Sequence, residues 1–200
     1  MIAVVDYDTG NLRSVADALR RIGAGFTLTA DPAQLLQAER VILPGVGEAA
    51  SAMARLRERG LDEVIPRLKV PVLGICIGMQ LLGRWSEEGD TACLGIFSAR
   101  VGRIPATTRE GARLKVPHVG WDTIEGLRTP LFDGIDEGAY VYYVHSYAAG
   151  RCAATAATTD YGVAFSAALA RDNFFGVQFH PEKSGRTGAR ILENFLNMNR

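Results

Sequence analysis

A cysteine framed by two glycines is the feature that most constrains this chain. Cys76 follows an apolar run typical of a buried strand, residues 70–75, and precedes a run typical of a helix, residues 77–84. Gly74 and Gly78 stand two positions to either side of it. This spacing makes a sharp strand-to-helix turn, in which glycine is needed because the neighbouring backbone leaves no room for a Cβ. The motif therefore predicts an α/β fold that holds the Cys76 side chain out of the sheet.

The same turn favours nucleophilic chemistry at Cys76. A helix that begins directly after the cysteine offers free backbone N–H groups and the positive end of its dipole, which stabilise a thiolate and later an oxyanion. A small cysteine among glycines is also a common core residue. A purely structural role for Cys76 is therefore the alternative, and the rest of the sequence has to decide between the two.

Composition limits the classes of protein to which the chain can belong. Its 200 residues, 48% of them hydrophobic, suit one compact domain, and we predict a single domain over residues 1–200. The 22 basic and 22 acidic residues balance without a basic stripe, so nucleic acid is not an expected partner. No apolar run approaches the ~20 residues that cross a bilayer, and residues 1–6 predict a strand rather than a signal peptide.

The cysteines predict a reducing compartment. Cys76, Cys93 and Cys152 are an odd number at wide spacing, which argues against a disulfide framework and favours the cytoplasm. Cys93 and Cys152 lack glycine frames and are expected to be structural. No Cys/His cluster has the spacing of zinc ligands, so we expect neither a metal nor a cofactor.

The chain changes character near residue 96. Before it, apolar strands alternate with amphipathic helices, which predicts a mostly parallel sheet covered on both faces. Asn11 is expected to cap the first helix, and Gly23 stands just past its end. After residue 96, short β-like runs predict antiparallel strands attached to that sheet, and a helix closes the chain. The expected strands are 2–5, 26–29, 41–43, 70–75, 99–104, 120–124, 139–147, 152–159, 163–169 and 174–179, and the expected helices are 12–22, 49–59, 77–84 and 189–196.

A cysteine nucleophile needs a base, and the chain has three histidines, His118, His145 and His180. His180 comes at the end of an apolar run, and Pro181 ends that strand because it cannot donate to the ladder. Glu182 follows and can accept a hydrogen bond from the imidazole. The pattern favours His180 as the base and Glu182 as its orienting carboxylate. His145 is expected to position substrate or fill the core, and His118 to serve positioning or an interface.

Together these motifs resemble a known family. Gly-Ile-Cys-Ile-Gly-Met-Gln at 74–80 with Gln-Phe-His-Pro-Glu at 178–182 is similar to the class I (triad) glutamine amidotransferases. Within that family the chain resembles the glutaminase subunits of imidazole glycerol phosphate synthase, from histidine biosynthesis. Val119 stands where methionine is common and Asp122 where asparagine is common, and neither is expected to be catalytic. The segments that carry this resemblance are 6–12, 43–47, 117–121, 142–147 and 179–184.

The resemblance implies both a fold and a reaction. The fold is the class I glutamine amidotransferase-like (flavodoxin-like) α/β sheet flanked by helices, with added antiparallel strands in the C-terminal half. The reaction is hydrolysis of L-glutamine to glutamate and ammonia through a thioester on Cys76. His180 moves the proton, and Glu182 holds the useful tautomer of the imidazole. By the same resemblance, Gly45, Gln80, Ser146 and Tyr147 hold the glutamine.

The resemblance also implies where the oxyanion binds. Ile77 begins the helix after Cys76 and is expected to offer its backbone N–H. A second donor is expected from the loop Gly45-Val46-Gly47, through Val46 or Gly47, because its two glycines permit a peptide flip. An ordinary turn at a strand end is the alternative for this loop.

A partner is implied as well, a (βα)₈-barrel cyclase that forms a heterodimer with the chain. It would take the ammonia through its barrel and make imidazole glycerol phosphate and an aminoimidazole carboxamide ribotide. The expected docking residues are Asn11, Trp121, Tyr140, Tyr142 and Lys183. Tyr140 and Tyr142 are two positions apart on a strand and share a face, although plain core aromatics are the alternative.

Two other functions remain open from the sequence. The same Cys76, His180 and Glu182 could serve another synthase, one of pyridoxal phosphate, anthranilate or guanylate (GMP) synthesis. The fold could also be kept as a non-catalytic regulatory module, but an intact set of the three residues argues against that reading.

Overall fold

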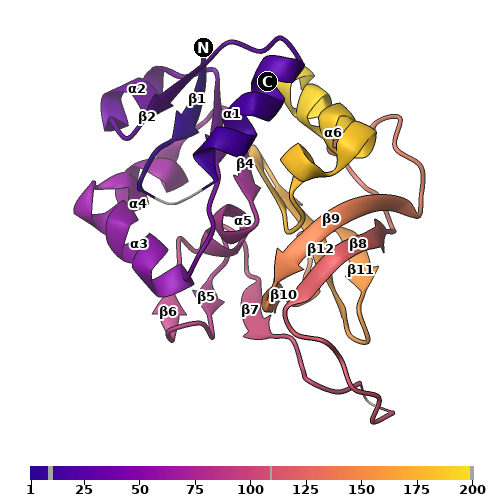
Figure 1. The fold of residues 1–200 in the computed structure, drawn as a ribbon. Coiled ribbons are helices and arrows are strands. Elements are labelled where there is room, and N and C mark those ends of the chain that lie inside the picture. Colours follow the sequence, from indigo (N-terminus) through magenta and orange to yellow (C-terminus); the bar gives the residue numbers. More distant parts are fainter. Residues whose placement is uncertain (9–10, 109, 199–200) are drawn as a thin grey trace.

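A seven-stranded sheet lies at the centre of the protein, in the strand order β11-β12-β13-β4-β3-β1-β2 (Figure 1). The computed structural model describes residues 1–8, 11–108 and 110–198, so Thr9 and Gly10 of the 6–12 motif lie outside the described residues. Its parallel strands are β1 Ile2–Val5, β2 Phe26–Thr29, β3 Arg40–Leu43, β4 Val72–Ile75 and β13 Phe174–Val177, and its antiparallel edge is formed by β11 Thr155–Asp160 and β12 Ala164–Arg171.

Helices cover both faces of this sheet because the strand order reverses after β2. Right-handed crossovers then put the helix before β2 on the face opposite to the helices that lead into β3 and β4. The first helix buries Val15, Ala16 and Leu19 toward the sheet, as its periodicity predicts, and the last helix packs near it. The helices are α1 Leu12–Arg21, α2 Pro32–Gln37, α3 Ala49–Glu58, α4 Leu61–Val64, α5 Ile77–Leu81 and α6 Gly185–Asn197.

The predicted strands and helices of the first 83 residues are found, with shifts at their ends. Helix α5 ends at Leu81, earlier than predicted, because the chain turns at Gly83 into a short strand. A Cβ at Gly83 would lie 2.9 Å from the Gln80 carbonyl oxygen, so this turn also depends on glycine. Helices α2 and α4 are too short for their periodicity to be recognised in the sequence.

The prediction that the strands after residue 96 all join the first sheet as antiparallel strands was wrong for most of them. Only β11 and β12 do so, and β13 lies parallel to β4 in the buried centre of the sheet. Pairing partners are set by the tertiary fold, which strand-like runs do not encode. Strands β7 Arg100–Arg103 and β10 Tyr147–Ala149 form a four-stranded sheet with β5 Trp85–Ser86 and β6 Thr91–Ala92, two short strands before residue 96 that were not predicted. Strands β8 His118–Ile124 and β9 Ala139–His145 form a two-stranded ribbon.

The ribbon of β8 and β9 projects beside the main sheet (Figure 1). One of its faces buries Val141 and Tyr143, whereas the other leaves Trp121 and Tyr140 exposed. No described helix is long and apolar enough to cross a membrane. Within residues 1–8, 11–108 and 110–198, no three His, Cys, Asp or Glu side chains form a group that could hold a metal ion.

Candidate active site

Cys76 occupies the strained turn that the sequence predicts between β4 and α5. Its φ of 53° and ψ of −111° are unusual for a residue with a side chain. A Cβ on Gly78 would lie 1.8 Å from the Leu43 carbonyl oxygen, and one on Gly74 would lie 2.7 Å from the backbone of Gly78. The two glycines therefore let strand β3, the turn and the start of α5 pack without space between them.

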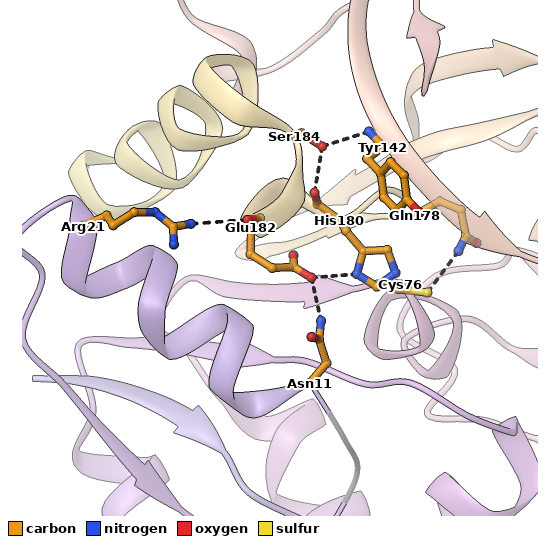
Figure 2. Close-up of polar contacts among 8 residues, drawn as sticks. All are labelled: Asn11, Arg21, Cys76, Tyr142, Gln178, His180, Glu182 and Ser184. Carbon is orange, nitrogen blue, oxygen red and sulfur yellow. Dashed lines mark hydrogen bonds and ion pairs between the residues drawn. The ribbon is translucent and has the colours of Figure 1, made fainter. Parts of the chain in front are cut away.

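His180 reaches Cys76 because their strands are parallel neighbours. Strands β4 and β13 pair Ile75 with Val177, so the residues that follow them emerge at the same edge of the sheet. The His180 Nδ1 and the Glu182 Oε1 are 2.7 Å apart, and both side chains are almost fully buried. The sulfur of Cys76 lies beside the imidazole ring (Figure 2). The structure thus brings together the three residues predicted to be catalytic.

The surroundings of His180 favour its charged form. Burial by itself lowers the pKa of His180, but hydrogen bonding to Cys76 and Glu182 and the charges of both raise the pKa to about 10. The ring therefore carries a second proton at neutral pH, between a carboxylate and a sulfur. An imidazolium in this position can give a proton to a leaving group at the Cys76 side.

Glu182 is held from helix α1 as well as by His180. The Asn11 Nδ2 donates to the Glu182 Oε1 at 2.6 Å, and the Arg21 guanidinium donates to the Glu182 carbonyl oxygen at 3.3 Å (Figure 2). Asn11 is the N-cap residue of helix α1, as expected, but its side chain makes no capping bond and turns to the carboxylate instead.

Gln178 is a site residue that the sequence reasoning missed. Its side chain is completely buried, and its Nε2 lies 3.7 Å from the Cys76 sulfur, to which it donates. Its Oε1 accepts from the Gln80 Nε2 at 2.9 Å. The signal was present, since Gln178 stands two residues before His180 at the end of one strand and so faces the same way.

A cavity of about 380 Å³ opens beside the sulfur, a volume suited to a small molecule. Gly45, predicted to hold substrate, is not one of its lining residues, because it is buried where a Cβ would lie 2.6 Å from the Tyr7 hydroxyl. The other residues predicted around the substrate do line it. The lining consists of Val46, Gly47, Cys76, Ile77, Gln80, Glu88, Pro117, Val144, His145, Ser146, Tyr147 and His180.

Glu88 is the acidic residue of this lining, and no motif pointed to it. Its Oε2 accepts from the Ala49 backbone N–H at 2.9 Å, at the start of helix α3. Burial raises the pKa of Glu88, whereas the bond to Ala49 opposes that shift. The carboxylate thus ties the loop of residues 86–91 to the helix that follows the 45–47 loop.

The groups predicted to bind the oxyanion lie at the Cys76 end of the cavity. Ile77 is the first residue of α5, where a backbone N–H has no partner within the helix. Gly47 has a φ of 102°, a conformation that favours glycine, and nothing lies within 4 Å of the position of a Cβ there. The 45–47 loop is therefore tightly packed at Gly45 but has open space at Gly47.

Of the residues predicted for docking, Trp121, Tyr140 and Tyr142 lie on the outer face of the ribbon, and Lys183 lies beside Tyr142. Asn11 lies apart from them, at the start of helix α1, where its side chain bonds to Glu182. Trp121 is 54% exposed and Tyr140 is 61% exposed, so these two are not core aromatics. The rings of Trp121 and Tyr142 meet edge to face with centroids 5.9 Å apart, and the Lys183 Nζ lies 5.9 Å from the Tyr142 ring. We call the outward side chains Val119, Trp121, Tyr140, Tyr142 and Val144 the ribbon face.

Comparison with known proteins identifies the family. The model of the family "Glutamine amidotransferase class-I" matches residues 3–198. The chain belongs to the class-I glutamine amidotransferases. This amidotransferase shares 52% identity with a Bacteroides thetaiotaomicron protein named imidazole glycerol phosphate synthase subunit HisH, over 98% of this chain and 99% of the relative. Proteins of the same name from Haemophilus influenzae (45% identical) and Dehalococcoides mccartyi (47%) are covered over 96% and 97% of their length, and this chain over 98% and 99%.

Solved structures with this fold superpose on almost the whole length of this amidotransferase. A glutamine amidotransferase from Thermotoga maritima superposes with a TM-score of 0.66 at 19% identity, over 98% of this chain and 82% of that one. A second glutamine amidotransferase structure gives a TM-score of 0.75 at 18% identity, over 98% and 97%. At such identities the likeness shows the fold alone. The predicted family and fold class are confirmed.

Proposed function

We propose that this chain is the glutaminase subunit of imidazole glycerol phosphate synthase, and that it hydrolyses L-glutamine and delivers ammonia to a cyclase subunit. The observation that carries the proposal is that Cys76 and His180 line the same cavity, from two neighbouring strand ends, while Glu182 bonds to the Nδ1 of His180. Full-length similarity to relatives named as subunits of that synthase supports the choice of assembly.

The reaction follows from the positions of the three side chains. The Cys76 sulfur attacks the side-chain amide carbon of glutamine and forms a carbon–sulfur bond, and the charge on the amide oxygen is taken up by backbone N–H groups. The His180 imidazolium gives its Nε2 proton to the leaving nitrogen, so ammonia departs and a thioester remains. Water, deprotonated by His180, then breaks the carbon–sulfur bond and releases glutamate. Glu182 keeps the Nδ1 proton in place throughout.

Gln80 is suited to hold the substrate. Its Nε2 donates both hydrogens to protein acceptors, whereas its Oε1 is buried without a hydrogen-bond partner among the described residues. An unpaired buried acceptor is costly. Gln80 lines the cavity, so a small shift of its side chain on substrate binding would let a substrate N–H reach this oxygen. Ser146, Tyr147, Val46 and Gly47 close the same cavity, in line with the roles that the sequence suggests for them.

The ribbon face supports a protein partner, which we take to be a (βα)₈-barrel cyclase in a heterodimer. Exposed Trp121 and Tyr140 are the kind of residues that carry binding energy in interfaces. Val144 belongs to the ribbon face and also lines the cavity, so a partner docked there would sit at the exit for ammonia. We place the assembly in the cytoplasm, where free cysteines such as Cys93 and Cys152 stay reduced.

The test is to co-express the chain with a barrel cyclase and to measure glutamate and imidazole glycerol phosphate from glutamine. We expect both products, and we expect Cys76→Ala to abolish glutamine-driven synthesis while synthesis from ammonium salts survives. The isolated chain should be a slow glutaminase, because the loop around Gly47 has no partner to hold its donating conformation. Loss of both activities in Cys76→Ala would contradict a division of labour between two subunits.

The other functions are outcomes of the same experiment. Glutamate release without any binding of the cyclase would point to another synthase, such as those for pyridoxal phosphate, anthranilate or GMP. No glutamate from a folded complex would leave a non-catalytic regulatory module. Either result would overturn the proposal.

A further inference from the structure

A buried polar chain leads from strand β8 toward the active site by a route that avoids His180. It begins at Asp122, whose Oδ2 lies 3.4 Å from the His118 Nε2. The His118 Nδ1 lies 3.1 Å from the His145 Nε2, and the His145 Nδ1 lies 2.8 Å from the Tyr147 carbonyl oxygen. Both histidines are buried, and His145 is also part of the cavity lining. The proposed reaction gives neither of them a chemical step.

The second half of the chain continues from the Tyr147 carbonyl to the sulfur. The Gln80 Nε2 donates to that carbonyl at 3.0 Å and to the Gln178 Oε1 at 2.9 Å. The Gln178 Nε2 donates to the Cys76 sulfur at 3.7 Å (Figure 2). A carbonyl oxygen can only accept, so it fixes the orientation of the Gln80 amide. Gln80 in turn fixes the Gln178 amide, and an N–H is thereby directed at the sulfur.

The number of protons on the two histidines indicates that their hydrogen bonds also run toward the Tyr147 carbonyl. Its three contacts are bounded by acceptors at both ends, the Tyr147 carbonyl and the Asp122 carboxylate, so each contact needs a proton of its own. Two neutral imidazoles supply only two. With the His145 Nδ1–H on the carbonyl and the His118 Nδ1–H on His145, the contact left without a proton is the longest one, at Asp122. Both rings then carry their proton on Nδ1.

The packing around His118 holds it in line. Its ring is stacked between Tyr161, with centroids 3.8 Å apart, and Tyr143, with centroids 4.9 Å apart. The Tyr161 hydroxyl donates a hydrogen bond to the Lys115 carbonyl oxygen. A ring held on both faces has little freedom to turn, so its Nδ1 stays directed at His145.

We propose that His118 and His145 are positioning residues, which hold the Tyr147 carbonyl so that Gln80 and Gln178 keep an amide N–H on the sulfur of Cys76. This rests on the proposed function in one respect only, that the sulfur is the nucleophile. A donor at the sulfur stabilises the thiolate over the thiol, so the chain acts on the reactivity of Cys76. It also gives strand β8, which carries Trp121 of the ribbon face, a connection to the sulfur that is independent of Glu182.

The test measures the alkylation rate of Cys76 by iodoacetamide in the full chain, resolved from Cys93 and Cys152 by peptide mass spectrometry. His118→Phe keeps a stacked ring but loses both nitrogens, whereas His118→Asn loses the stack but places an amide N–H near the position of Nδ1. We expect His118→Phe to slow the reaction at neutral pH by about 5-fold, the effect of one lost hydrogen bond, and His118→Asn to slow it less. The opposite order would mean that His118 only fills space and would overturn the proposal.

A double-mutant cycle tests the route through Gln178. Gln178→Leu removes the donor itself, so adding His118→Phe to it should slow alkylation no further. Additive slowing would show that the two residues act separately. Tyr161→Phe is the matched control, because it keeps the ring that stacks on His118 and changes no residue of the polar series between Asp122 and Cys76. Cys76 should be alkylated at the wild-type rate in this variant. Alkylation needs no turnover, so these results stand apart from the glutamate assay that tests the proposed function.

The protons themselves can be seen by long-range ¹H–¹⁵N correlation spectra, which are simple because the chain has three histidines. We expect His145 and His118 in the Nδ1–H form, which free histidine disfavours. A His145 ring protonated on Nε2 alone could not donate to the Tyr147 carbonyl, and its hydrogen bond with His118 would run the other way. This result would overturn the proposal, whatever the alkylation rates.

Discussion

The side chain of Asn11 donates a 2.6 Å hydrogen bond to Oε1 of Glu182, across 171 positions of sequence. The same oxygen accepts the Nδ1–H of His180 at 2.7 Å. Asn11 therefore fixes which carboxylate oxygen meets the imidazole and at what angle. It does so from the start of helix α1, directly after residues outside the described part of the chain.

Replacing Asn11 should lower glutaminase turnover without changing the affinity for glutamine, because its side chain bonds to the orienting carboxylate and does not line the cavity. Asn11→Gly is the informative change, since Asn11 has a φ of 77° that glycine accepts without strain. We expect kcat to fall by about 5-fold for the lost bond. Asn11→Asp should fall further, because two carboxylates would then face each other. Steady-state kinetics of the complex check both, and a change in KM alone would contradict this role.

The charge of His180 should depend on Cys76. The hydrogen bond and charge of Cys76 help to raise the pKa of His180 to about 10, so the ring should stay doubly protonated from acid to mildly alkaline pH. In Cys76→Ala that support is gone while Glu182 remains, and the pKa should move down toward its ordinary value of 6.5. A titration of the ¹⁵N shifts measures it. The idea fails if the His180 titration is the same in both proteins.

The ribbon face should carry the binding energy of the partner complex. Trp121→Ala removes a large exposed ring, and central aromatic anchors of this kind cost at least about 2 kcal/mol, or about 30-fold in affinity. Leu36→Ala is a matched control, because Leu36 is 60% exposed on helix α2, away from the ribbon (Figure 1). Calorimetric titration with the cyclase gives both affinities. Equal losses for the two variants would place the interface elsewhere.

Much of the site was predictable because it depends on local backbone constraints. The glycine frame around Cys76 specifies a turn whose close contacts the structure shows at Gly74 and Gly78. Strand β13 ends at Val177, earlier than predicted, and Pro181 begins a short 3₁₀ helix, so His180 stands between the end of the strand and that turn. Parallel neighbours then bring the two residues together. These rules act over a few residues and are legible in a single sequence.

What escaped prediction depends on which segments pair in space. The ribbon of β8 and β9 reads in sequence as two more strands of the main sheet, and its separation follows from tertiary packing. Asn11 looks like a helix cap, because a free Asn at a helix start usually caps, and only the fold brings Glu182 within its reach. His118 and His145 are 27 positions apart, and their pairing depends on the antiparallel register of the ribbon.

The glycine at the second position after Cys76 should contribute strongly to the stability of the fold. In Gly78→Ala the new Cβ would lie 1.8 Å from the Leu43 carbonyl oxygen, so strand β3 has to shift. Overpacking of this kind costs about 3 kcal/mol, which lowers the melting temperature by about 6–12 °C in a chain of this size. Gly23→Ala is the control, because its Cβ would meet nothing and only its φ of 72° is unfavourable, at about 1 kcal/mol. Thermal unfolding of both variants checks the difference, and equal melting temperatures would contradict it.

The buried His145 should make the protein sensitive to acid. Burial lowers the pKa of His145 to about 4, with the nearby His118 and His180 acting in the same direction and the bond to Tyr147 opposing them. Between about pH 6.5 and about pH 4, His145 is therefore protonated in the unfolded chain but not in the folded chain. As the pH decreases through this range, the free energy of unfolding decreases by up to about 3 kcal/mol. His180 adds nothing to this slope, because its raised pKa keeps it protonated in both states over most of the window.

His145→Asn keeps an N–H for the Tyr147 carbonyl and has no titrating ring. Urea unfolding at several pH values should therefore show a shallower loss of stability in this variant than in the wild type, whatever the variant costs at neutral pH. An unchanged slope would mean that His145 is not the group that takes up the proton on acid unfolding.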